Sequence, residues 1–195
     1  MKRAKIPEQE RYLLRQQHDF RRAADIVADA IMTFEEVEAV AVIGSVAKRL
    51  WREIPRFSEF RRAGIEVWHE CKDLDLAVWI SSQHRLDALR RARNRALREA
   101  RESGGPSTAD HQVEIFLIEP GTDRYLGRLC NYNVCPKGTP KCAVPGCGAV
   151  PFNKVVDGFV PYPDLLASAA HAMLYRRGVG RLRSALDLPK ADEGA

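Results

Sequence analysis

Hydrophobic positions along the chain follow two periods, one typical of helices and one typical of strands. Apolar residues recur every three or four positions over residues 8–33 and 82–103, which predicts two amphipathic helices. Continuous or alternating apolar runs over residues 37–43, 73–80 and 112–118 predict strands. Because helices and strands alternate in this order, the sequence predicts a small α/β or α+β domain, with a mixed sheet flanked by helices.

Shorter elements are expected between and after these. A helix is expected over residues 44–50, directly after the first strand, and residues 65–69 are a candidate short strand. Residues 130–148 are dense in Cys, Gly and Pro, which predicts irregular structure there. The stretch 164–176 follows a proline and predicts a last helix.

Three acidic residues stand at the beginnings of two predicted strands. Asp73 and Asp75 are two positions apart, so their side chains share one face of a strand. Glu114 opens the next strand, and Asp110, expected on the same face, is the alternative third acid. A helix joins the two strands, which predicts that they are parallel and that their starts share one edge of the sheet. Clustered carboxylates repel one another, and a hard cation such as Mg²⁺ offsets that repulsion.

A candidate phosphate site precedes these acids. Gly44 stands where a strand ends and a helix is expected, so backbone N–H groups can approach a phosphate there. Ser45 adds a hydroxyl donor, and Lys48 and Arg49 are placed to meet triphosphate charge. Taken singly, these short motifs also fit a strand edge or a helix cap. Together with the acids they predict metal-dependent phosphoryl transfer from a nucleotide.

The motifs Ile43-Gly44-Ser45, Asp73-Leu74-Asp75-Leu76 and Val113-Glu114-Ile115 resemble the signature of the nucleotidyltransferase superfamily of DNA polymerase beta. The resemblance covers about residues 8–119. It implies two Mg²⁺ ions, a nucleoside triphosphate, attack of an acceptor on the α-phosphate and release of pyrophosphate. It also implies that Gly44 and Ser45 hold triphosphate oxygens and that Asp73 and Asp75 bind metal. Glu114 would ligate the second metal or deprotonate the acceptor.

Two features depart from that signature. Between Ser45 and Asp73 lie 27 residues, more than the family's usual spacer, which implies an insertion around residues 52–70. The third acid is Glu114, where aspartate is commoner in the family.

Four cysteines predict a second, structural metal site. Cys130, Cys135, Cys142 and Cys147 are separated by four, six and four residues, with Pro and Gly nearby. Four thiolates suit a closed tetrahedral Zn²⁺ site. Uncoordinated thiols and an iron–sulfur cluster are the alternatives. Cys71 stands apart and is expected to be an ordinary buried or reactive thiol.

Composition narrows the class of protein. Hydrophobic residues make up 45% and charged residues 29% of the sequence, as in soluble globular proteins, and no apolar run is long enough to span a bilayer. The basic N-terminus has no apolar stretch behind it, so a cytoplasmic protein is expected. The net charge is +5, and seven arginines fall in residues 82–103. These arginines either bind RNA or another acidic partner or, more simply, form a solvated helix face.

Two hypotheses follow. The first is an Mg²⁺-dependent nucleotidyltransferase with a structural Zn²⁺, whose acceptor is a protein hydroxyl, an RNA end or a small molecule such as an aminoglycoside. Residues 1–124 would be the nucleotidyltransferase-like catalytic domain, residues 125–150 the zinc-binding knob and residues 151–195 a C-terminal extension with a helix. The second is a non-enzymatic module that binds a nucleotide, RNA or a partner, such as the antitoxin of a toxin–antitoxin pair with its toxin. Neither requires a membrane.

Overall fold

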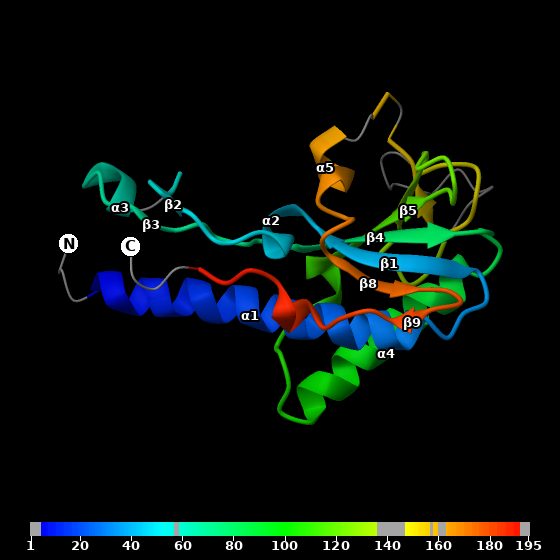
Figure 1. Cartoon of the computed structure of the whole chain (residues 1–195), viewed down its shortest axis with the longest axis horizontal. Coiled ribbons are helices and arrows are strands. Elements are labelled where there is room, and N and C mark those ends of the chain that lie inside the picture. The colour runs from blue at the N-terminus through cyan, green and yellow to red at the C-terminus, as the bar shows by residue number, and fades with distance from the viewer. Residues whose placement is uncertain (1–4, 57–58, 136–146, 157, 160–162, 192–195) are drawn as a thin grey trace.

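The structure, a computed structural model, describes residues 5–56, 59–135, 147–156, 158–159 and 163–191. A mixed sheet with helices on both faces forms the body, and a narrower arm extends from it beside the N-terminal half of the longest helix (Figure 1). In chain order the described elements are α1 (Lys5–Ile31), β1 (Val37–Ile43), α2 (Gly44–Ala47), β2 (Arg52–Glu53), α3 (Glu59–Arg62), β3 (Val67–Trp68), β4 (Leu74–Ile80), α4 (Leu86–Glu102), η1 (Asp110–Gln112), β5 (Val113–Ile118), β6 (Tyr125–Leu129), β7 (Asn153–Lys154), α5 (Pro163–Ala167), β8 (Met173–Arg176), β9 (Gly180–Arg181) and η2 (Ala185–Asp187).

Seven of the described strands form one mixed sheet in the order β7-β6-β5-β4-β1-β8-β9. β4 and β5 are parallel, as predicted, because α4 carries the chain back to the edge where β4 began. The other neighbouring pairs in this sheet are antiparallel. The β4–β5 pair therefore brings the starts of two strands together at one edge.

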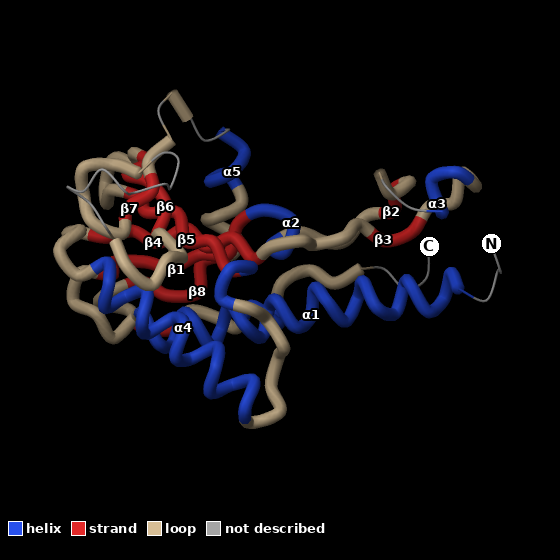
Figure 2. Tube along the Cα trace, turned by 180° about the vertical axis from the view of Figure 1, so that it is seen from behind, coloured by secondary structure: helices blue, strands red, loops and turns tan. Residues whose placement is uncertain are grey.

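The helices α1 and α4 cover one face of the sheet, which we call the helix face (Figures 1 and 2). Both are amphipathic, and their apolar residues join every second residue of the central strands in the main core. None of the described helices combines the length and the apolar character needed to cross a bilayer.

The opposite face, which we call the α5 face, carries a smaller apolar cluster. The α5 segment and Met173 of β8 pack there against the alternate residues of β1, β4 and β5. Many of these strand residues are alanines, so the covering segment approaches the sheet closely. The acidic residues of the sequence motifs belong to this same face.

The five strongest sequence predictions are confirmed with small shifts of their ends. The strands predicted over residues 37–43, 73–80 and 112–118 are β1, β4 and β5. The helices predicted over residues 8–33 and 82–103 are α1 and α4. Each has a hydrophobic period long enough to identify it without tertiary information.

The helix predicted over residues 164–176 is wrong in its second half. The helix α5 ends at Ala167, and residues 173–176 form β8, which pairs with β1. Without β8, the buried strand β1 would present an unpaired edge, and sheet pairing therefore overrides the helical propensity of this stretch. The helix predicted over residues 44–50 is also too long, because α2 spans only Gly44–Ala47.

The sheet contains strands from each of the three predicted segments, residues 1–124, 125–150 and 151–195. β6 and β7 lie on either side of the Cys-rich segment and extend the sheet beyond β5. β6 is short and lacks a clear alternation, and the sequence pattern did not predict it. The Cys-rich segment is therefore attached to the sheet at both of its ends.

The arm consists of residues 48–72 and includes residues 52–70, the stretch in which the sequence predicts an insertion. Its short strands β2 and β3 form an antiparallel pair apart from the main sheet, and α3 follows β2. Figure 2 shows the arm running beside α1 and away from the sheet. Its two ends lead directly to α2 and to β4, so the arm is anchored at both halves of the candidate site.

Replacing Leu174 on β8 tests this fold. Leu174 is fully buried in the main core, so Leu174→Ala is expected to lower the free energy of unfolding by about 2–5 kcal/mol. The matched change Leu182→Ala, at a side chain that is 42% exposed, is expected to have little effect. Urea titration of both variants measures the difference, and equal small losses would contradict the placement of β8 in the core.

Candidate functional site

The acids of the sequence motifs occupy adjoining positions of the sheet. Asp75 on β4 is opposite Ile43 at the end of β1, and on its other side it is opposite Glu114 on β5. Both acids alternate with members of the apolar cluster, so both project from the α5 face. Asp73 lies just before β4, two positions from Asp75. The parallel register thus brings together the three acids that the sequence predicted to form a site.

Electrostatic coupling shows how closely these carboxylates face one another. Burial, with repulsion from Glu114 and then from Asp73, raises the pKa of Asp75 to about 7. Burial and repulsion from Glu114 also raise the pKa of Asp73, while His111 and Lys72 oppose that rise. At neutral pH this edge of the sheet therefore holds an acid that is only partly ionised.

Gly44 packs directly against the Asp75 carboxylate. Its φ angle of 70° lies in the left-handed region that glycine adopts without strain. A Cβ atom at this position would lie 2.6 Å from Oδ2 of Asp75, which is too close for any side chain. The left-handed φ and this close contact together favour glycine here, and they show that the main chain of α2 lies next to the Asp75 carboxylate.

Side chains of α1 fix the turn that contains Gly44 and Ser45. Arg21 is buried and donates hydrogen bonds to the carbonyl oxygens of Val46, at 3.1 Å, and Lys48, at 3.0 Å. Gln17 donates to the same Lys48 carbonyl at 2.8 Å. The last carbonyl groups of this short helix therefore have partners on α1, and α2 cannot shift without breaking them.

The remaining predicted phosphate ligands are placed less specifically. Ser45 is half-buried, and its side chain interacts with Cys71, opposing the rise that burial causes in the pKa of that thiol. Lys48 and Arg49 are exposed just beyond α2. Because α2 has only four residues, the expected contribution of a helix dipole is small, and any phosphate contact would depend on local N–H groups.

The structure distinguishes the two candidates for the third acid. Glu114 couples electrostatically to both Asp73 and Asp75. Asp110 instead lies in η1, where its charge acts on the buried guanidinium of Arg93. Glu114, rather than Asp110, is the acid that shares an environment with the Asp73–Asp75 pair.

Arg128 is a site residue that sequence reasoning missed. It lies on β6 opposite Phe116, stacks its guanidinium over that ring at 5.6 Å, and forms an ion pair with Glu114. Its charge also opposes the rise in the pKa of Asp75. Identifying it would have required knowing that residues 125–129 form a strand beside β5.

The cysteines are described only in part, because Cys142 lies outside the described residues. Cys130 is buried at the end of β6, and the backbone N–H of Phe152 donates to Sγ of Cys135 at 3.3 Å. Across the described ranges, no group of three His, Cys, Asp or Glu side chains is arranged to hold a metal ion. The predicted zinc site and the Mg²⁺ site both stay predictions.

Two buried arginines adjoin the cysteines. Arg93 is fully buried, donates to Oδ1 of Asn131 at 2.7 Å, and has an Nη2 atom without a partner among the described residues. Burial lowers its pKa to about 10, and Cys130 is one of the charges that oppose this. Arg90, one turn earlier, is also buried and donates to Asn133. Thiolates bound to Zn²⁺ carry net negative charge, and these guanidinium groups have the sign to balance it.

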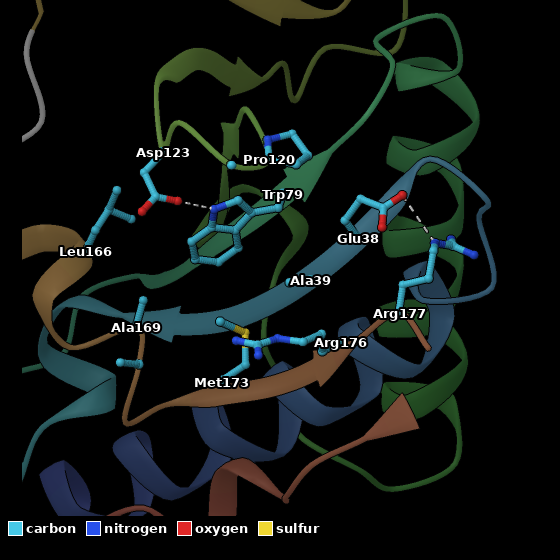
Figure 3. A pocket seen from close by; sticks show the side chains of 12 residues that line it. Glu38, Ala39, Trp79, Pro120, Asp123, Leu166, Ala169, Met173, Arg176 and Arg177 are labelled. Atoms are coloured by element: carbon cyan, nitrogen blue, oxygen red, sulfur yellow. Dashed lines mark hydrogen bonds and ion pairs between the residues drawn. The ribbon is translucent and has the colours of Figure 1, made fainter. Parts of the chain in front are cut away.

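A separate pocket of about 390 Å³ lies at the far end of the same sheet face (Figure 3). Trp79 forms one wall and donates its indole N–H to Oδ1 of Asp123 at 2.6 Å, with Met173 facing it from β8. Four residues of extended strand, about 13 Å, separate Trp79 from Asp75. Fully buried Ala77 lies between them, so this pocket is not continuous with the carboxylates.

Comparison with known proteins gives no match to this chain, whether among protein-family models, curated proteins or solved structures. The functional argument therefore rests on the residues and geometry of the site.

The raised pKa of Asp75 makes stability depend on pH. An unfolded aspartate releases its proton near pH 4, whereas folded Asp75 holds it up to about pH 7. The stability that this proton gives the folded state is therefore complete below pH 4. It decreases as pH rises above 4 and is lost once pH has risen through 7. Without divalent metal, Asp75→Asn is expected to be more stable than wild type at pH 8. The expected difference in the free energy of unfolding is roughly 2 kcal/mol, about half of the free energy that corresponds to the whole pKa shift.

That difference is expected to fall to about a third of its pH 8 value at pH 5 and to vanish only below about pH 4, where aspartate is protonated in the unfolded chain as well. Urea titrations in EDTA at both pH values measure it, with Asp164→Asn, at an exposed carboxyl of α5, as the matched control. A difference of equal size at pH 5 and pH 8 would show that the carboxyl does not titrate between them.

Proposed function

We propose that this protein is a nucleotidyltransferase, which moves a nucleoside monophosphate from a nucleoside triphosphate to an acceptor hydroxyl and releases pyrophosphate. The observation that carries this proposal is the convergence of Asp73, Asp75 and Glu114 on adjoining strand starts, beside a glycine whose Cβ the Asp75 carboxylate excludes. Carboxylates that repel one another at the starts of two neighbouring strands destabilise the fold. A bound cation would remove that repulsion and would explain why the sequence keeps the acids.

The donor chemistry of this cluster fits Mg²⁺, which prefers carboxylate and phosphate oxygens. Asp73 and Asp75 would hold the cation together with the triphosphate, and Glu114 would join them on exchanging its Arg128 partner for the cation. When bound, Mg²⁺ neutralises phosphate charge and lowers the pKa of a coordinated hydroxyl. The partial protonation of Asp75 in its absence agrees with a site that is completed by positive charge.

The chain's own groups supply the remaining functions. Gly44 and Ser45, fixed by Arg21 and Gln17 of α1, would bind triphosphate oxygens, and exposed Lys48 and Arg49 would offset their charge. The acceptor oxygen would form the new bond to the α-phosphorus while the bond to the β-phosphate oxygen breaks. The acceptor's proton would pass to Glu114.

A pocket of about 120 Å³ beside Glu114 is the candidate acceptor site. Its described lining includes Glu114 but neither Asp73 nor Asp75, so an acceptor bound there would contact Glu114. Its described lining residues are Glu114, Arg128, Leu129, Cys130, Asn131, Tyr132 and Lys154. The small volume favours a single hydroxyl-bearing group over a long stretch of polynucleotide inside the pocket.

The Arg128–Glu114 ion pair favours one alternative. In a non-enzymatic nucleotide- or partner-binding module, such as an antitoxin, Arg128 would neutralise Glu114 permanently and no metal would be needed. Asp73 and Asp75 would then keep a mutual repulsion that Lys72, His111 and Arg128 offset only in part. We therefore rank transfer above binding alone.

Transfer is tested by incubating the protein with each nucleoside triphosphate, Mg²⁺ and candidate acceptors, and measuring pyrophosphate release and labelled acceptor. Wild type is expected to be active with at least one combination. Asp75→Asn is expected to retain the fold and lose transfer by several orders of magnitude. Asp110→Asn is the matched control, since Asp110 faces Arg93 and should leave transfer largely intact. Equal activity of wild type and Asp75→Asn would refute the proposal.

Glu114→Gln separates the roles within the cluster. Because Glu114 comes from a different strand than the aspartates, it is expected to serve the acceptor more than the triphosphate. The variant should keep most of its Mg²⁺-nucleotide affinity in calorimetry while transfer falls by orders of magnitude. A loss of affinity in proportion to activity would contradict this division.

The zinc site is tested independently of activity. Purified protein is expected to contain one tightly bound Zn²⁺ per chain, held by Cys130, Cys135, Cys142 and Cys147, and Cys142→Ser should lower the thermal midpoint. Cys71→Ser, which removes a cysteine remote from the set, is the control for metal content. Metal-free protein that is fully folded would exclude the site.

A further inference from the structure

An exposed tryptophan stands at the base of the arm. Trp51 is 41% exposed, whereas Trp68 and Trp79 are buried. Exposure of a single aromatic ring is common at protein surfaces, and the feature that sets Trp51 apart is how its ring is held.

The ring is held in one orientation despite its exposure. It stacks on His69 with ring centres 4.0 Å apart and planes at 22°. Its indole N–H donates to Oε2 of Glu53 at 3.0 Å, and Oε1 of the same carboxylate lies 2.9 Å from Nδ1 of His69. The backbone N–H of His69 also donates to the carbonyl of Trp51 at 2.8 Å. Glu53 thus links the two stacked rings, and one face of the indole is presented to solvent.

This aromatic pair is attached to the same helix as the candidate phosphate site. Arg52, next to Trp51, stacks over Trp68 at 4.6 Å and pairs with Glu10 of α1. Further along α1, Gln17 and Arg21 hold the α2 turn. One rigid helix therefore sets the position of the arm relative to Gly44 and Ser45.

Chain length limits how far the pair can lie from the carboxylates. His69 is four residues from Asp73, so their Cα atoms are at most about 14 Å apart. Trp51 is six residues beyond Ser45, and exposed Lys48 and Arg49 lie between them. These two cations therefore lie on the stretch of chain that joins the α2 turn to the indole.

We propose that the solvent-facing side of Trp51 is the stacking platform for the base of the nucleoside triphosphate. This inference rests on the proposed function, and it gives the 27-residue spacer between Ser45 and Asp73 a role. Stacking on an aromatic ring depends on the π-face that every base has, so the site takes purines and pyrimidines and favours the larger purine. Glu53 and His69 are positioning residues for the ring.

Tryptophan fluorescence during titration with Mg²⁺-ATP tests the platform, with inorganic tripolyphosphate as the probe that lacks a base. ATP is expected to quench the exposed indole, and Trp51→Phe should lose this signal while Trp68 and Trp79 continue to emit. By calorimetry, Trp51→Ala should bind ATP about tenfold more weakly or worse, and tripolyphosphate as tightly as wild type does. Trp51→Phe should keep most of the ATP affinity, because phenylalanine still stacks.

Tyr12→Ala is the matched control, since it removes an exposed aromatic side chain from α1 and should leave both affinities unchanged. Unchanged ATP affinity in Trp51→Ala would overturn the platform, and a parallel transfer assay on that variant would show whether the proposed function still stands. Unchanged ATP affinity with weaker use of an RNA acceptor would assign the ring to the acceptor and overturn the proposal. Equal losses for ATP and tripolyphosphate would attribute the effect to the phosphate site, which also contradicts stacking. Failure of wild type to bind ATP would overturn both proposals.

Discussion

Three carboxylates share the start of β4 and β5, and their mutual repulsion is the constraint around which this part of the molecule is arranged. The register places Asp75 between Ile43 and Glu114, so the Asp75 and Glu114 carboxylates cannot move apart along the strands. Two local features reduce the cost. Asp75 holds its proton to near neutral pH, and Arg128 supplies a positive charge to Glu114. Neither feature removes the acids, which remain grouped on an accessible face.

The helix α1 is the element that organises this edge. It covers the helix face of the sheet, fastens α2 through buried Arg21, and carries the ion pair that ties down the arm. Buried guanidinium groups that donate to several carbonyls fix geometry more strictly than apolar contacts do, because each lost hydrogen bond leaves a buried polar group without a partner. The candidate site therefore owes its shape to a helix that contributes no acid to it.

Local pattern and topology rules were enough to predict the central elements and the meeting of Asp73, Asp75 and Glu114. Each of these depends on hydrophobic period and on the parallel crossover, which are properties of short stretches. Arg128 was missed because the short strand β6 has no clear alternation, and β8 was missed because it is defined by pairing with β1, far earlier in the chain. Residues 173–176 have a helix-compatible composition, and only the open edge of β1 makes them a strand. The stacking of Trp51 on His69 likewise joins positions 18 apart that no periodicity connects.

The ion pair between Arg128 and Glu114 has a consequence for how the proposed site would respond to its surroundings. A guanidinium that already occupies the third acid is an internal competitor for any incoming cation. Occupancy by a cation would then depend on how much more strongly Glu114 binds the cation than it binds Arg128. Weakly held monovalent ions would not displace the arginine. The proposed site would therefore bind a divalent cation more weakly than three unpaired carboxylates would, because the cation has to displace the arginine from Glu114. A single side chain on a neighbouring strand would in this way set the concentration of divalent cation at which the proposed site fills.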